Sequence, residues 1–293
     1  MRYLTDHRAG IRRDPRALLP SAQSIICVGK VYKQPDTAPH IARYAVVPDY
    51  HEVMKINLER LARRLQETFG SFEYRCFVDT APLLERTYAR LAGLGWIGKN
   101  TCLINQELGS WLFLGEIVTS LALEPNAPPP DRCGTCTRCI DACPTDALIP
   151  GGLRTLLDST RCISYYTIEH RGEVPEPMRE ALGDWIFGCD ICQDVCPWNN
   201  RAAETQDPAF ASAIKDESLD RLGQLTPEEF RSRFRNTPVW RTKYSGFLRN
   251  VAVAMGNSRD KRYRPVLTRL AASEDSVVAA HANWALAQME MFE

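Results

Sequence analysis

The segment RCGTCTRCIDACP at residues 132–144, followed by CDICQDVCP at residues 189–197, decides the fold of this chain. The first run spaces its cysteines as Cys-x2-Cys-x2-Cys-x3-Cys-Pro. This is the bacterial ferredoxin pattern, in which three thiolates hold one [4Fe–4S] cube and the fourth reaches a second cube. The second run adds three cysteines, and Cys162 lies between the two runs. Eight thiolates make two four-thiolate sites, so the sequence predicts a protein that moves single electrons.

The same spacing rule predicts a crosswise sharing of the ligands between the two runs. The first cluster takes three cysteines of the first run and the last cysteine of the second run: Cys133, Cys136, Cys139 and Cys196. The second cluster takes the remaining four: Cys143, Cys162, Cys189 and Cys192. This exchange would tie the segments together and bring the cubes close enough for electron transfer.

Two other interpretations of the cysteines compete with the cluster prediction. Disulfides need an oxidising compartment, whereas residues 1–10 are charged and lack the apolar core of a secretory signal. Zinc favours two Cys-x2-Cys pairs around one tetrahedral ion rather than three cysteines at x2 spacing closed by x3-Cys-Pro. Cys27, Cys76 and Cys102 have no such spacing, and we interpret them as buried small apolar residues.

Composition sets broad limits on the protein. Its 293 residues can form more than one domain, and 36 basic residues balance 36 acidic ones, so net charge indicates no class of partner. No apolar stretch approaches the roughly 20 residues that a membrane helix needs. Oxygen-sensitive clusters and free thiols predict a cytoplasmic protein without a membrane partner.

Three regions follow along the chain. Residues 1–125 alternate strand and helix patterns, which predicts a layered domain of the α+β or α/β class. We expect strands at 24–31, 72–78 and 111–121 and amphipathic helices at 50–69 and 82–94. A proline-rich linker at 124–131 precedes the ferredoxin-like module, residues 131–200.

The region 222–293 is predicted to be helical, with short helices at 247–255, 265–270 and 276–289. This pattern resembles a helix pair of the HEAT type, which cannot bury its own apolar face and must pack on the rest of the chain. A plain helical hairpin is the alternative.

Three features of the first region are candidates for a site. Asp79 follows an expected strand and precedes a helix, where α/β sheets bind ligands, although it can equally cap that helix. The loop Gly93–Asn100 (GLGWIGKN) suits a large cofactor close to the backbone, but it is neither a Rossmann fingerprint nor a Walker loop. His51 lies near the Asp49 carboxylate, although a histidine at a helix start is more often structural.

Taken together, these residues resemble the epoxyqueuosine reductase family, cobalamin-dependent iron–sulfur enzymes of the last step of queuosine synthesis in tRNA. The resemblance covers nearly the whole chain. Besides the cysteine runs, the matching motifs are Arg43-Tyr44, Asp49-Tyr50-His51, Val78-Asp79-Thr80-Ala81-Pro82, Gly93–Asn100, Gly109-Ser110-Trp111, Leu114-Gly115-Glu116, Arg161-Cys162-Ile163-Ser164-Tyr165 and Leu248-Arg249-Asn250. Family members usually carry further residues before the equivalent of Met1, so the chain is expected either to start late or to have lost an opening strand and helix.

The resemblance implies a cobalamin in the first domain, with its own base displaced and no protein ligand below cobalt. The D-x-H-x-x-G motif of histidine-ligated cobalamin proteins is missing, because Met54 occupies the glycine position. Carried over by position, Asp79 is the proton donor. Arg12, Lys99, Asn100 and Ser164 are the implied cofactor contacts. The implied partners are a tRNA bearing epoxyqueuosine and a flavodoxin or ferredoxin that donates electrons to a monomeric enzyme.

The implied reaction removes the epoxide oxygen as water with two electrons and two protons. Cobalt in its Co(I) state would attack or reduce the epoxide, and a carboxylic acid would protonate the departing oxygen. Apolar Phe77, Val78 and Trp96 predict that loss of hydration raises the pKa of Asp79 enough to keep it protonated.

Contact with tRNA is predicted at the C-terminal third, where positive charge and aromatic rings interleave. The basic residues are Arg231, Arg233, Arg235, Arg241, Lys243, Arg249, Lys261, Arg262 and Arg264, and the aromatic ones are Phe234, Trp240, Tyr244 and Phe247. The alternative is an ordinary solvated helix face, with Lys and Arg stems covering apolar surface.

Three rival functions remain at this point. A reductive dehalogenase combines the same cofactors but typically carries an export signal. An electron-carrier subunit would need neither Asp79 nor the Gly93–Asn100 loop. A non-catalytic RNA-binding helical protein leaves the eight cysteines unexplained.

Overall fold

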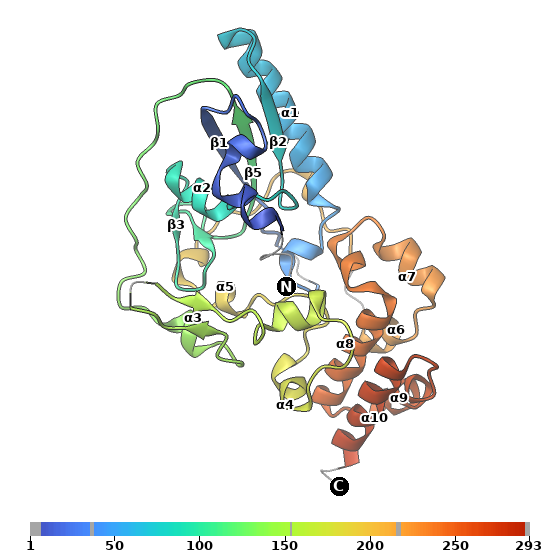
Figure 1. Cartoon of the computed structure of the whole chain (residues 1–293). Helices are drawn as coiled ribbons and strands as arrows, with labels where there is room; N and C mark the ends of the chain where they lie inside the picture. Colours follow the sequence, from blue (N-terminus) through green and yellow to red (C-terminus); the bar gives the residue numbers. More distant parts are fainter. Residues whose placement is uncertain (1–6, 36–37, 153, 215–217, 291–293) are drawn as a thin grey trace.

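The computed structural model describes residues 7–35, 38–152, 154–214 and 218–290, and a three-stranded antiparallel sheet lies in its first region. The central strand β5 (Leu112–Thr119) pairs along its whole length with β1 (Ser24–Val31). Its second half also pairs with β2 (Tyr74–Phe77), as Figure 1 shows. The mixed fold agrees with the predicted class, and the antiparallel pairing gives it α+β character.

Different helices contact the two faces of this sheet. The helix α1 (Tyr50–Phe69) has the predicted bounds and packs on β5 through Met54 and Leu58. Gly115 permits the close approach, because a Cβ there would lie 2.9 Å from the Cδ1 atom of Leu58. The shorter α2 (Glu85–Leu91) packs against β1 and β5. Because successive strand residues point to opposite faces, Glu116 points away from α1, which Gly115 faces.

The glycine-rich loop forms part of a small hairpin. Its strands are β3 (Trp96–Ile97) and β4 (Leu103–Ile104), which pair antiparallel. A Cβ at Gly95 would lie 2.2 Å from the Ile104 carbonyl oxygen, so only glycine fits there. The sequence predicts that a cofactor packs closely on these glycines. At Gly95 it is the protein backbone at Ile104 that packs there instead.

The cysteine-rich module is built of short elements. Its connection to the sheet, residues 122–133, contains no helix or strand and loops around one side of the molecule in Figure 1, in keeping with the predicted linker. The helices are α3 (Arg138–Asp141), the π-helix η6 (Tyr165–Glu169), α4 (Glu176–Arg179), η7 (Glu180–Leu182), α5 (Ile191–Asp194) and η8 (Pro197–Asn199). The strands β6 (Leu148–Ile149) and β7 (Leu156–Leu157) form one hairpin.

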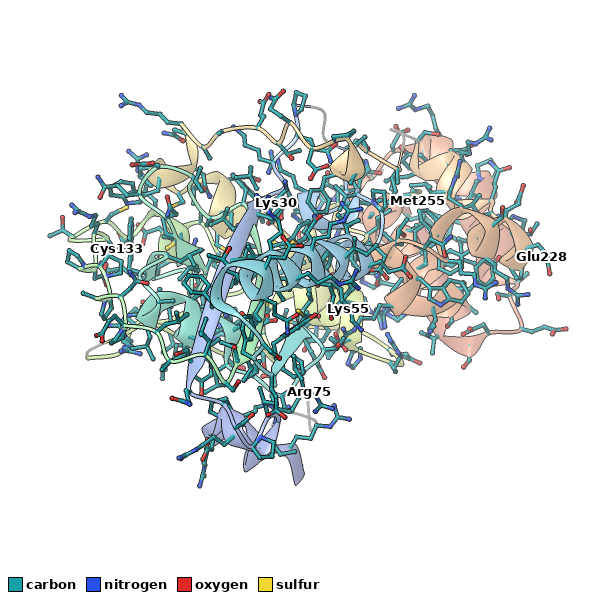
Figure 2. All side chains as sticks on the ribbon, turned by 90° about the horizontal axis from the view of Figure 1, so that it is seen from above. Lys30, Lys55, Arg75, Cys133, Glu228 and Met255 are labelled. Carbon is teal, nitrogen blue, oxygen red and sulfur yellow. The ribbon has the colours of Figure 1, made fainter. Side chains whose placement is uncertain are left out.

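The last region is helical, as predicted. Its elements are α6 (Leu219–Gly223), α7 (Pro227–Phe234), η10 (Pro238–Thr242), α8 (Lys243–Ser258), η11 (Lys261–Tyr263), α9 (Arg264–Ala271) and α10 (Ser276–Glu290). The helix α10 packs against α8 and α9. In Figure 2 this end of the molecule, marked by Glu228, lies opposite the Cys133 end, with α1 between them.

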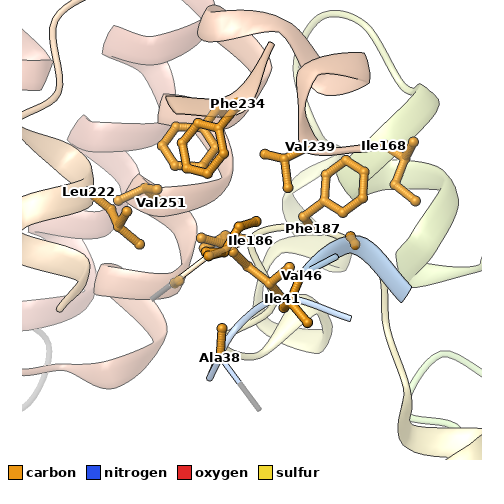
Figure 3. Packing of buried hydrophobic residues seen from close by; sticks show 14 of the residues in the cluster. Ala38, Ile41, Val46, Ile168, Ile186, Phe187, Leu222, Phe234, Val239 and Val251 are labelled. Carbon is orange, nitrogen blue, oxygen red and sulfur yellow. The ribbon is translucent and has the colours of Figure 1, made fainter. Parts of the chain in front are cut away.

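One hydrophobic core joins all three regions. Figure 3 shows Ile41 and Val46 of the first region beside Ile186 of the module, with Val251 of α8 nearby. The helical region therefore buries its apolar face against the rest of the chain. This agrees with the expectation that a single helix pair cannot bury that face by itself. Within the described ranges, no helix is both long and apolar enough to cross a bilayer.

A buried arginine also fastens α8 to the module. The Arg249 side chain is 1% exposed and donates to the carbonyl oxygens of Tyr166 at 2.6 Å, His170 at 3.0 Å and Gly172 at 2.9 Å. Arg249 was predicted to contact tRNA, and that prediction is wrong because its guanidinium is used inside the protein.

Candidate functional site

The predicted ligands of the first cluster surround one cavity. Cys133, Cys136, Cys139 and Cys196 all line a cavity of about 250 Å³ beside the Gly93–Asn100 loop. Cys139 is within electrostatic reach of the other three thiols. The four cysteines predicted for the first cluster therefore lie together, and their sharing of one cube stays a prediction.

The surroundings of this cavity fit an iron–sulfur cube. The indole N–H of Trp96 is buried without a hydrogen-bond partner among the described residues, and its ring packs with Cys196 and Cys133. A cube brings sulfur atoms that can accept from such a donor. Lys99 donates to the carbonyl oxygens of Gly134 at 2.8 Å and Cys136 at 3.0 Å, which ties the glycine-rich loop to the cysteine loop.

The predicted ligands of the second cluster also lie together. Cys189 is within electrostatic reach of Cys162 and Cys143, and Cys192 of Cys189 and Cys162. In the part of the chain that the structure describes, no three His, Cys, Asp or Glu groups are close enough to hold a single metal ion. A cube is wider than one ion, so its ligands surround a volume rather than a point.

Cys102 belongs to this neighbourhood, contrary to its interpretation as a plain apolar residue. Its thiol lies within hydrogen-bonding reach of the Cys192 thiol. The buried Asn100 amide donates to the Cys192 carbonyl oxygen at 3.3 Å and accepts from the Cys102 N–H at 3.1 Å. The loop Gly93–Asn100 therefore supports both sets of cysteines.

Asp79 occupies a tight turn that directly follows β2. Its φ of 52° lies in the left-handed region, and the Thr80 N–H donates to the Val78 carbonyl oxygen at 2.6 Å across it. Such three-residue turns are rare and strained for residues other than glycine, by about 1–3 kcal/mol. The structure also excludes the capping alternative, because α2 begins six residues later with Leu84 at its N-cap. This backbone strain indicates that the Asp79 turn has a functional role.

A histidine between two carboxylates holds the Asp79 side chain. The His51 Nε2 atom lies 3.3 Å from the Asp79 Oδ2 atom, and its Nδ1 atom lies 2.7 Å from the Asp49 Oδ1 atom. Asp49 also caps α1 by accepting from the His51 N–H. Tyr50 stacks on the His51 ring at 4.3 Å between centroids. The Asp79 side chain is 45% exposed, so solvent or a substrate can reach it.

The protonation state of this pair differs from the prediction. The hydrogen bond from His51 holds the pKa of Asp79 below its ordinary value, and the same bond raises the pKa of His51. The expectation that lost hydration raises the pKa of Asp79 is therefore wrong, because the histidine outweighs the burial. When the pair binds one proton, that proton therefore lies mainly on the imidazole.

The Asp79 site adjoins the second set of cysteines and the helical region. The half-buried Tyr44 side chain interacts electrostatically with Asp79 and with Asp190, which directly follows Cys189. Arg241 also acts electrostatically on Asp79, and its Nε atom lies 2.7 Å from a carboxylate oxygen of Glu169. Segments that are far apart in the sequence therefore lie close together around the partly exposed Asp79 side chain.

The implied cofactor contacts are scattered. Lys99 and Asn100 are bonded to the cysteine loops, as described above. Arg12 lies in the short helix η3 (Ile11–Arg13), and Ser164 directly precedes η6. Their contact with a cofactor stays a prediction.

The basic C-terminal set divides into buried and exposed members. Three of its predicted members, Arg249, Phe234 and Phe247, are buried. The prediction that they contact tRNA is therefore wrong. Arg241 and Lys243 are exposed at the start of α8, where the Lys243 Nζ atom lies 5.1 Å from the Trp240 ring centroid. The exposed Lys261 and Arg262 lie beyond the other end of α8. Of these exposed residues, Arg241 acts electrostatically on Asp79.

Comparisons with known proteins give the family of this chain. Residues 132–199 match the model of the 4Fe-4S double cluster binding domain, and residues 12–80 match the model of epoxyqueuosine reductase QueG. The epoxyqueuosine reductase of Xanthomonas campestris is 43% identical over 98% of this chain and 84% of its own length. The chain belongs to the epoxyqueuosine reductase family. It is an oxidoreductase with a double [4Fe–4S] domain, as predicted.

Two solved structures of family members are similar to the fold described here. A crystal structure of epoxyqueuosine reductase with an epoxyqueuosine-modified tRNA-Tyr stem loop has a TM-score of 0.84 at 31% identity, over 94% of this chain and 76% of that one. The Bacillus subtilis enzyme, reported with its catalytic aspartate loop swung out of the active site, has a TM-score of 0.83 at 30% identity, over 96% and 77%.

Sequence reasoning missed several residues of this site. The motifs drew attention to Asp49 and His51 but gave no link to Asp79, which lies 28 residues further on. The pairing of Glu85 with Glu116 was also not predicted, although Glu116 lies in one of the matching motifs and a glutamate in a strand as apolar as 111–121 was a usable signal.

Proposed function

We propose that this chain reduces epoxyqueuosine to queuosine at the wobble position of tRNA. The observation that carries the proposal is the exposed Asp79, held by His51 in a strained turn beside eight cysteines arranged as two sets of four. In this reaction both bonds from carbon to the epoxide oxygen break, a carbon–carbon double bond forms, and the oxygen leaves as water. Two electrons and two protons balance the change.

Asp79 and His51 supply protons in this proposal. Asp79 faces the departing oxygen and passes to it the proton that protonated His51 gives up through their hydrogen bond. Asp49 holds the imidazole in place from its other nitrogen. The second proton comes from solvent, which reaches the 45% exposed Asp79 side chain. A general acid placed in this way contributes roughly 10²–10⁴-fold to a rate.

The cysteine sets and a cobalamin supply the electrons. Two cubes on the two sets would deliver single electrons at low potential, and a bound cobalamin would supply a strongly reducing cobalt centre beside Asp79. The residues fit a cobalamin without a histidine ligand, because both ring nitrogens of His51 already face carboxylates. We place Arg12, Lys99, Asn100 and Ser164 near it, with Lys99 and Asn100 acting also through the cysteine loops that they bind.

The tRNA approaches the Asp79 side of the molecule. Arg241 acts electrostatically on Asp79, and Lys243 and Trp240 lie beside it in sequence and contact each other. Positive groups that neutralise phosphates and an aromatic ring that stacks on a base are the usual means of binding an extruded nucleotide. We assign this surface to the RNA flanking the modified base.

The remaining partners follow from the chemistry. We propose a flavodoxin or ferredoxin as electron donor, a monomeric enzyme and a cytoplasmic location, because the clusters need a low-potential donor and a reducing compartment.

One experiment separates this function from its rivals. Protein purified without oxygen is mixed with cobalamin, and its absorption spectrum and its conversion of an epoxyqueuosine stem loop are followed. The proposal requires a changed corrinoid spectrum and the appearance of queuosine. A carrier subunit would show neither, and a dehalogenase would show the spectrum but no queuosine.

A further inference from the structure

A carboxyl group lies buried inside the sheet domain without an obvious reason. Glu116 is at the middle of β5, its side chain is 0% exposed, and neither carboxyl oxygen has a hydrogen-bond partner among the described residues. An ionised carboxylate that is buried without a partner costs free energy of folding. The Glu116 carboxyl is therefore either neutral or retained because it has a function. Its strand neighbours across the sheet are Cys27 and Phe77, which bring no positive charge.

Glu85 links this buried group to the Asp79 turn. It begins α2 and lies within electrostatic reach of Glu116. One of its carboxyl oxygens accepts a hydrogen bond from the Asp79 backbone N–H. This bond holds the residue whose φ is 52° by its backbone, whereas His51 holds only its side chain. Glu85 and His51 thus fix the same aspartate from two sides.

The two glutamates differ in their protonation state near neutral pH. Burial raises the pKa of Glu116 to about 9, with a further contribution from the Glu85 charge, and burial raises the pKa of Glu85 to about 7. Near neutral pH, Glu116 is therefore the protonated partner and Glu85 the one that loses its proton as pH rises. The charged and titratable groups that face the pair are Asp79 from the turn, Arg86 from α2 and Cys27 from β1, with Tyr50 of α1 within electrostatic reach of Glu85.

We propose that Glu85 is a positioning residue for the proton donor: its carboxylate clamps the backbone of the Asp79 turn, and neutral Glu116 behind it keeps that carboxylate as an acceptor. The inference rests on the proposed role of Asp79. It adds that the turn is held most firmly when Glu85 is ionised, because a carboxylate accepts more strongly than a neutral acid. Below about pH 7 Glu85 takes up a proton and the clamp weakens.

Amide hydrogen exchange tests the clamp directly. The exchange of a peptide covering residues 78–84 is measured in the full-length, cluster-loaded protein and corrected for the intrinsic effect of pH. In the wild type, protection should be lost as pH falls from about 8 to about 6. Glu85→Ala should lack this protection at every pH. Glu85→Gln, which keeps an acceptor oxygen but cannot titrate, should recover protection and make it independent of pH.

Turnover distinguishes positioning from simple stability. Misplacing a reacting group by about 1 Å can cost roughly 10²-fold, so Glu85→Ala should lower kcat roughly 10- to 100-fold while KM for the stem loop stays constant. Glu85→Gln should restore most of that loss and remove the step near pH 7 from the rate profile. Glu116→Gln, read by exchange alone, should keep the turn protected, because a neutral amide replaces a neutral acid.

Clear results would overturn the proposal. Wild-type protection that does not change between pH 8 and 6 would show that ionised Glu85 does not clamp the turn. A Glu116→Gln protein as unprotected as Glu85→Ala would contradict the role given to neutral Glu116. If Glu85→Ala fails to fold, the pH series of the wild type and of Glu85→Gln still decides. An active Asp79→Asn protein would remove the proposed proton donor but would leave the exchange result unchanged, so the two failures are distinguishable.

Discussion

Replacing Asp79 by Asn keeps the size of the side chain and removes its ability to transfer a proton. An amide can still bond to His51, so the turn should keep its shape. Loss of a general acid costs roughly 10²–10⁴-fold in rate. At 1.36 kcal/mol for each factor of ten, this loss corresponds to about 3–5 kcal/mol of transition-state stabilisation. Asp49→Asn, which loosens the hold on His51 without touching Asp79, should cost less.

The assay is a single turnover of an epoxyqueuosine stem loop without oxygen, with cobalamin and excess chemical reductant, followed by mass analysis of the nucleosides. Excess reductant makes the rate independent of the natural electron donor. Iron content and stem-loop affinity of Asp79→Asn should equal those of the wild type. An Asp79→Asn rate within about threefold of wild type would refute the assignment, because a general acid typically contributes roughly 10²–10⁴-fold.

The wild-type rate in the same assay should fall as pH rises through the raised pKa of His51, because the Asp79–His51 pair then loses the proton that it must deliver; a rate that keeps increasing above that range would contradict the shared proton. Arg241→Glu with Lys243→Glu should weaken stem-loop binding and flatten its salt dependence by roughly 0.7 per lost phosphate contact. The matched control Lys261→Glu with Arg262→Glu makes the same charge change about 24 Å away along the 16 residues of α8, so its effect should be smaller, and equal effects would move the interface. Cys196→Ser should lower the iron content from eight towards four per chain with the second cluster retained, and loss of all iron would show that the two sets do not form separately. His281 accepts the Val174 N–H at 3.0 Å while buried, and burial lowers its pKa to about 4, so its stabilising effect should be full above its ordinary pKa of 6.5 and disappear as pH falls towards 4. His281→Gln should flatten the melting temperature between these pH values, and an unchanged slope would assign the acid sensitivity elsewhere.

Local pattern predicted much of this fold. The amphipathic spacing of α1 gave its bounds at residues 50–69, because one face buries Met54 and Leu58 while the other is charged. Cysteine spacing predicted a double [4Fe–4S] module, and the matching domain at residues 132–199 confirms it, whereas the division of the thiols between the two cubes stays a prediction. The strand around Phe77 was predicted at 72–78 but spans Tyr74–Phe77; the turn at Asp79 accounts for its earlier end, and its later start has no explanation in the local pattern.

Properties that depend on distant neighbours escaped the sequence. The pKa of Asp79 was predicted to rise from its apolar flanks, but His51 approaches from another element and lowers it. Arg249 was predicted to be a surface cation, yet its buried guanidinium donates hydrogen bonds to three backbone carbonyl oxygens of the module. Cys102 has no ligand spacing, and only the folded chain brings it to Cys192. In each case the deciding partner is fixed by tertiary packing.

The central claim is that two cubes on eight thiolates feed this site. Iron, zinc and acid-labile sulfide, determined together on protein purified without oxygen, test it most directly. The account predicts eight irons and eight sulfides per chain with no stoichiometric zinc. Four irons, or zinc in place of iron, would contradict it.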